Sequence, residues 1–194
     1  MGRLFFTADQ HFDHDNKLGG IIHFCDRPFK DLITMNNTLI RNWNERIKPE
    51  DDVIVLGDFA YRAGKMKPSL YLNMLTGNKT LVKGNHDKSN GLNIKIQNLV
   101  VKNGNDEIYC VHNPRLVNLN YEINFVGHVH QNWKYKKIEW GGTGGKRNIL
   151  INVGVDAWKF YPVEMQELMA FVASIRNVPY VVYNLDSWRM MGRR

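Results

Sequence analysis

The stretch Leu81-Val82-Lys83-Gly84-Asn85-His86-Asp87 changes character halfway along. A short apolar run, typical of a β-strand, ends in four residues that are poorly suited to continue it. A strand that stops at a loop of Asn, His and Asp carries metal-binding and proton-transfer groups to the edge of a sheet. We therefore expect the ends of other strands to bring partners to this loop.

The bulk composition is that of a single soluble domain covering residues 1–194. Apolar residues make up 43% and charged residues 23% of the chain, and no apolar run approaches the roughly 18 residues of a membrane span. Two cysteines, Cys25 and Cys110, give a weak disulfide framework, so we expect reduced thiols and a cytoplasmic location. The net charge of +7 favours anionic partners such as nucleotides or nucleic acid, although solubility alone would also explain it.

The first half of the chain alternates strands with helices. We expect strands at 4–8, 53–56 and 80–82, a helix capped by Asp31 that runs to about Ile47, and a second helix from about Pro68 to Gly77. The buried stripe of the first helix recurs every four residues: Met35, Leu39, Trp43 and Ile47. In such α/β patterns, ligand sites lie at the carboxyl ends of the strands.

The second half contains shorter strand-like pieces that follow one another closely. They lie at 107–111, 124–126, 133–140 and 147–152. Pro162 is expected to open a helix, and the basic tail at 176–194, whose role the sequence leaves open, contains one more strand-like run at 180–183.

Five segments place polar residues directly after an apolar run. They are Asp9-x-His11, Gly57-Asp58, Gly84-Asn85-His86-Asp87, His112-Asn113-Pro114 and Gly127-His128-Val129-His130. Apart from His86 and Asp87, they offer oxygen and nitrogen ligands without a thiolate, which suits two first-row divalent ions. Residues two apart point the same way if the backbone stays extended, and the glycines at 57, 84 and 127 allow sharp departures from the strands.

In this order, the five segments resemble the blocks of the calcineurin-like metallophosphoesterase family. Two further stretches resemble a compact bacterial and phage subfamily: Arg27-Pro28-Phe29, and Asn152-Val153-Gly154-Val155-Asp156. The resemblance covers about residues 3–170. It implies an α/β fold, a four-layer αββα sandwich of two mixed sheets with flanking helices.

The resemblance also implies a role for each site residue. Ligands of the first metal would be Asp9, His11 and His130, ligands of the second would be Asn85, His112 and His128, and Asp58 would bridge the two ions. His86 would meet the leaving-group oxygen, with Asp87 as its orienting partner. The fourth block reads Val111-His112-Asn113-Pro114-Arg115, whereas members of the family more often have a serine before the histidine and an aromatic residue after it, and this departure leaves the substrate preference open.

The activity implied is hydrolysis of a phosphoester by a hydroxide that bridges two divalent ions, with Mn²⁺ favoured and Fe, Zn, Ni or Mg as alternatives. A phosphodiester of a nucleotide or nucleic acid is the favoured substrate. A phosphomonoesterase or protein phosphatase on the same site is one alternative, and a non-catalytic binding scaffold of this fold is another. The sequence does not indicate the oligomeric state.

Three weaker candidates each have a structural alternative. His14 could reach a substrate phosphate or be an exposed loop histidine, and Arg27 could clamp phosphate or pair with a loop carboxylate. The aromatic and cationic run at 133–137 could stack a nucleotide base. For that run we favour the other interpretation, an edge strand guarded by lysines.

Overall fold

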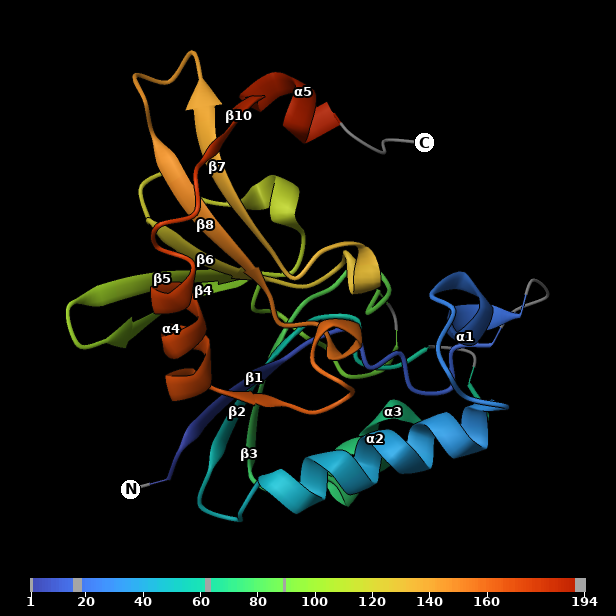
Figure 1. Ribbon diagram of the computed structural model, residues 1–194. Coiled ribbons are helices and arrows are strands. Elements are labelled where there is room, and N and C mark those ends of the chain that lie inside the picture. Colours follow the sequence, from blue (N-terminus) through green and yellow to red (C-terminus); the bar gives the residue numbers. More distant parts are fainter. Residues whose placement is uncertain (1, 16–18, 62–63, 89, 191–194) are drawn as a thin grey trace.

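The computed structural model describes residues 2–15, 19–61, 64–88 and 90–190. Figure 1 shows two sheets that converge near the centre of the molecule, with helices outside them. No helix in these described ranges is long and apolar enough to cross a membrane.

The smaller sheet has four strands in the order β3-β2-β1-β9. Its members are β1 (Leu4–Thr7), β2 (Asp52–Leu56), β3 (Asn78–Val82) and β9 (Val163–Glu164). The first three are parallel, whereas β9 runs antiparallel to β1. The continuous apolar run in β2 is buried on both faces, as expected of an inner parallel strand.

The larger sheet has six strands in the order β10-β7-β8-β6-β5-β4. Its members are β4 (Asn98–Asn103), β5 (Asp106–Val111), β6 (Ile123–Val126), β7 (Tyr135–Gly141), β8 (Arg147–Asn152) and β10 (Val181–Asn184). Parallel pairs join β5, β6 and β8, and antiparallel pairs join β4 to β5 and β7 to β8. Both sheets are therefore mixed.

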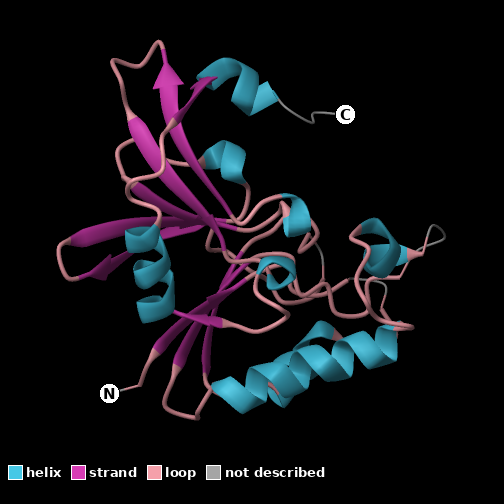
Figure 2. Ribbon diagram, in the orientation of Figure 1, coloured by secondary structure: helices cyan, strands magenta, loops and turns pink. Residues whose placement is uncertain are grey.

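Helices flank the two sheets (Figure 2). They are α1 (Gly20–Phe24), α2 (Leu32–Arg46), α3 (Pro68–Met74), α4 (Met165–Ser174) and α5 (Leu185–Met190). One apolar cluster joins α2 and α3 to the smaller sheet, and another joins α5 to the far face of the larger sheet. Between the sheets lies a third cluster, in which Phe6 meets Phe125 edge to face at 5.0 Å. The expected αββα layering is confirmed.

Most of the expected elements are present. Asp31 caps α2 by accepting a hydrogen bond from the Thr34 amide, and the stripe from Met35 to Ile47 is buried. The helix expected to open at Pro162 begins instead at Met165, because Val163 and Glu164 pair with β1 as β9. Strand β4 and helices α1 and α5 were not expected.

The C-terminal segment is part of the larger sheet. Strand β10 pairs in parallel with β7 (Figure 1), so β7 is an inner strand and the expectation of a lysine-guarded edge is wrong. Lys137 is 4% exposed, and its ammonium donates to the carbonyls of Ile175, Arg176 and Val178 at the end of α4.

Candidate metal centre

The polar segments come together where the two sheets meet. A parallel bridge joins Ala8, after β1, to Gly154, after β8, and the Val155 amide donates to the Ala8 carbonyl at 3.0 Å. This contact brings the carboxyl ends of β1, β2 and β3 next to those of β5, β6 and β8. The expected site residues follow these strand ends, the position at which ligand sites form in α/β sheets.

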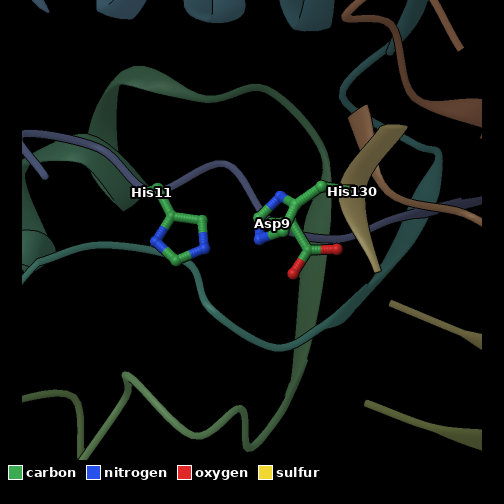
Figure 3. A group of neighbouring side chains, drawn as sticks. All are labelled: Asp9, His11 and His130. Carbon is green, nitrogen blue, oxygen red and sulfur yellow. The ribbon is translucent and has the colours of Figure 1, made fainter. Parts of the chain in front are cut away.

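A first group of possible ligands contains Asp9, His11 and His130. One ligand atom from each lies within 4.8 Å of the other two, and all three residues are buried. Figure 3 shows Asp9 and His11 on the loop after β1 and His130 on a separate short helix. This group could hold a metal ion.

A second group contains Asp58, His112 and His128, whose ligand atoms also lie within 4.8 Å of one another. Asn85 joins this group through its amide oxygen, which is 2.9 Å from Nε2 of His112 and 2.8 Å from Nδ1 of His128. The four side chains come from the ends of β2, β3, β5 and β6, so no short piece of sequence could form the group alone.

Asp58, a member of the second group, also lies close to the first. Its Oδ2 atom is 3.6 Å from Nε2 of His11 in the first group and 3.2 Å from Nε2 of His112 in the second. Gly84 permits this placement, because a Cβ atom there would come within 2.1 Å of Oδ1 of Asp58. Gly84 is thus required for a close approach, whereas Gly57, at φ +87°, provides the sharp turn that we expected of it.

The backbone of the site is left-handed rather than extended. Five of the expected ligands have positive φ: Asp9 (61°), His11 (52°), Asp58 (54°), His128 (73°) and His130 (47°). The expectation that persistent extended geometry aligns each pair is therefore wrong. Asp9 and His11 share the first group, but His128 and His130 belong to different groups. Residues other than glycine seldom adopt a positive φ. The backbone strain of those that do is concentrated at functional sites.

Hydrogen bonds fix the orientation of two of the histidines. Nδ1 of His112 is 2.7 Å from the Leu56 carbonyl, and Nδ1 of His130 is 3.0 Å from Oδ2 of Asp156. Both oxygens accept, so each Nδ1 carries a proton. Burial lowers the two pKa values, but the carboxylates of Asp58 and Asp156 outweigh it and raise the pKa of His112 to about 9 and that of His130 to about 10. A metal ion would replace the second proton of each ring, at Nε2. Metal-binding histidines typically have this arrangement.

The buried polar atoms of the first group fit a cation. Nε2 of His11 is buried and has no hydrogen-bond partner among the described residues. Burial raises the pKa of Asp9 to about 6 and lowers the pKa of His11 well below its usual range. A divalent ion would stabilise the ionised carboxylate and accept the lone pair of the neutral imidazole.

Arg27 does not reach toward the site as a phosphate clamp. Its guanidinium is fully buried and pairs with both oxygens of Asp156 at 2.8 Å, so the alternative of a carboxylate partner is the correct one. It also donates to the carbonyls of Asp9 and Gln10. Since Asp156 also accepts from His130, Arg27 and Asp156 together hold the first group in place. We assigned no role to Asp156 from the sequence, although it lies in one of the stretches that carried the resemblance.

Asp87 also has a different role from the one we expected. Its carboxylate accepts hydrogen bonds from the amides of Asp58, Phe59 and Gly84 and from the side chain of Asn90. No hydrogen bond between Asp87 and His86 is present among the described residues. Asp87 therefore joins the loops after β2 and β3 and does not orient His86.

His86 is exposed and lies over the site. Its amide donates to Oδ1 of Asp58 at 2.8 Å, and its ring is 5.2 Å from that of His11 and 5.3 Å from that of His14. His14 is buried, so the alternative of an exposed loop histidine is wrong. Its ring stacks on Tyr61 at 4.6 Å, and burial lowers its pKa to about 4.

Comparisons with known proteins support the fold and the family. None of the known family models matches the chain. The chain is 31% identical over 176 residues to the uncharacterized protein MJ1445 of Methanocaldococcus jannaschii, covering 89% of this chain and 92% of that protein. A solved structure, the protein of unknown function AQ665 from Aquifex aeolicus, matches 88% of this chain and 100% of its own, at 23% identity and a TM-score of 0.63.

Vps29 from Chaetomium thermophilum is more distant. It is 13% identical, with coverage of 78% of this chain and 70% of its own and a TM-score of 0.43. The AQ665 structure supports the same fold for this chain. By the identity and coverage of the archaeal relative, the chain belongs to the family of MJ1445.

Proposed function

We propose that this chain is a dinuclear metal-dependent phosphoesterase that hydrolyses phosphodiester bonds, with a nucleotide or nucleic-acid-derived substrate. The observation that carries the proposal is the position of Asp58 close to ligands of both groups, 3.6 Å from His11 and 3.2 Å from His112. A carboxylate in this position could be a ligand to an ion in each group. The seven expected ligands would then hold two ions, with Mn²⁺ favoured.

When bound, such ions lower the pKa of a bound water toward neutrality and neutralise phosphate oxygens. The residues of the chain orient the metal ligands and assist the leaving group. Arg27 and Asp156 keep His130 oriented, and the Leu56 carbonyl does the same for His112. His86 is exposed beside His11 and is not needed as a ligand. We assign it to the leaving-group oxygen, to which a protonated imidazole ring can donate a proton.

The surface around the site favours a diester over a monoester. Two hollows border the second ligand group, one of about 370 Å³ on the His128 side and one of about 480 Å³ along Asn85 and His112. Lys83 and Lys88 line the larger hollow. A phosphodiester has two substituents on phosphorus, and each hollow can accept one of them. A monoester needs only one.

The test compares two ester classes on the metal-loaded protein. Apoprotein is reconstituted with Mn²⁺, and the hydrolysis of bis(p-nitrophenyl) phosphate is measured beside that of p-nitrophenyl phosphate. We expect the diester to turn over faster, and both chelation and Asp58→Asn to abolish activity. Faster turnover of the monoester would favour the phosphomonoesterase. Metal binding without turnover of either ester would favour the other alternative, a non-catalytic binding scaffold of this fold.

A further inference from the structure

A hollow of about 370 Å³ opens beside the second ligand group. Its lining includes one residue of that group, two cations and three aromatic rings: His128, Arg115, Lys136, Trp133, Tyr183 and Trp188. The volume lies within the range of small-molecule sites, about 300–1,000 Å³. Tyr183 and Trp188 come from the C-terminal segment that the resemblance does not cover.

The aromatic wall of the hollow is built by the C-terminal segment. Trp188 is 6% exposed, and its indole N–H donates to the Pro114 carbonyl at 3.0 Å. Its ring lies edge to face with Tyr183 at 5.4 Å and with Trp140 at 5.6 Å. Because these contacts hold both rings before any ligand arrives, the wall is preorganised.

Trp133 connects the hollow to the metal centre. It directly follows the short helix that carries His130, and the side-chain amide of Asn152 donates to the carbonyls of both residues, at 2.7 Å to His130 and 2.9 Å to Trp133. The backbone at Trp133 is therefore fixed relative to the ligand His130.

The cations beside these rings are available to an anion or a polar ligand. The side chain of Arg115 lines the hollow beside His128 and has no hydrogen bond or ion pair among the described residues. The ammonium of Lys136 donates to the Tyr183 hydroxyl at 3.1 Å. Aromatic rings with interspersed cations are the usual platform for nucleobases.

We propose that this hollow binds the base and sugar of a nucleotide whose phosphate lies at the metal centre, with Trp133 as the stacking residue and Arg115 beside the phosphate. The inference rests on the proposed function, because it places the phosphate there. It also assigns a role to the C-terminal segment, which forms one wall of a substrate site. From the run at 133–137, Trp133 and Lys136 then contribute to base recognition, because these two line the hollow.

Isothermal titration calorimetry on the full-length, Mn²⁺-reconstituted protein tests the inference. AMP, ribose 5-phosphate and inorganic phosphate are titrated separately. We expect AMP to bind about tenfold or more tightly than ribose 5-phosphate, because base stacking has an effect of this size. Trp133→Ala should remove this preference and leave the affinity for ribose 5-phosphate unchanged, while the matched variant Trp133→Phe should keep it.

The possible results test the base-binding hollow and the metal centre separately. Equal affinities for AMP and ribose 5-phosphate in the unsubstituted protein would overturn the base site and leave the proposed function standing. An AMP preference that persists in a folded Trp133→Ala protein would also overturn it. If none of the three compounds binds the metal-loaded protein, the proposed function fails together with the inference. The comparison of AMP with ribose 5-phosphate needs no variant, so the test holds even if Trp133→Ala does not fold.

Discussion

Several side chains of the candidate site belong to residues in the left-handed backbone conformation, which most residues other than glycine avoid. Asp9, His11, Asp58, His128 and His130 all adopt left-handed conformations. Each such residue costs roughly 1–3 kcal/mol, and glycine would avoid that cost. Asp and His nevertheless occupy these positions, which is expected if the side chains themselves are needed for chemistry.

At the residue scale, His86→Ala should separate metal binding from turnover. The ring is exposed above His11 and is not needed as a ligand, so the metal content should not change. Turnover of a diester with an alkyl leaving group should fall by about 100-fold or more, the usual effect of a general acid. A nitrophenyl ester, whose leaving group needs no proton, should lose much less. Full activity of the variant on the alkyl ester would exclude this role.

Asp87→Ala should weaken the fold before it affects the chemistry. Four donors would lose a charged acceptor, so we expect the free energy of unfolding to fall by about 3 kcal/mol. Glu107→Ala is the control, because it breaks only an exposed pair with Lys102 and should change the free energy by less than about 1 kcal/mol. Denaturant unfolding measures both, and similar values would refute the role assigned to Asp87.

The sequence predicts which residues gather at the site better than it predicts their partners. The candidates follow strand ends and could be identified from local patterns. Arg27 and Asp156 are 129 positions apart, and their pairing depends on the meeting of two sheets. The partners of Asp87 on the β2 loop are also distant in sequence. Local patterns contain no information on such contacts.

At the element scale, Lys137 joins β7 to the end of α4. Its buried ammonium donates to the carbonyl of Ile175, the residue that caps α4, and to those of Arg176 and Val178 just beyond it. Lys137→Met should therefore speed hydrogen exchange in the last turn of α4 by about tenfold or more. Lys136→Met, one position away, should leave those amides unchanged, because Lys136 donates to Tyr183 instead. Equal protection in the two variants would contradict this role of Lys137.

The pairing of β1 with β2 is supported by Arg3 and Asp51, which give stability a pH dependence. The hydrogen bond from Arg3 lowers the pKa of Asp51 from 3.8 to about 2. A depressed pKa adds stability above the unfolded-state value, and this stability is lost as the pH falls. Asp51→Asn should thus destabilise the protein at pH 7, and the difference from the unsubstituted protein should shrink between pH 3.8 and about 2. A difference that stays constant over this range would argue against the ion pair.

Elements with a strong pattern could be predicted, and elements defined by pairing could not. Helix α2 has a cap and a four-residue stripe, and β2 is continuously apolar. Strand β9 has only two residues and exists because it pairs with β1. Strand β10 was recognised as strand-like, but its partner β7 precedes it by about forty positions, and only the fold shows that it covers the edge of β7.

At the scale of the whole molecule, the site exists because two sheets meet. The smaller sheet contributes Asp9, His11, Asp58 and Asn85, and the larger sheet contributes His112, His128 and His130. Neither half holds a complete ligand group, since each group draws on both sheets. Metal binding should therefore couple to the docking of the two sheets and stabilise the folded protein.

The most direct test of the account is the metal stoichiometry of the reconstituted protein. Apoprotein is incubated with excess Mn²⁺, freed of unbound metal, and measured by inductively coupled plasma mass spectrometry. We expect two ions per chain, and a loss of both sites in Asp58→Ala, because this carboxylate lies close to ligands of both groups. A chain that retains no ion, or an Asp58→Ala variant that retains both, would contradict a dinuclear centre.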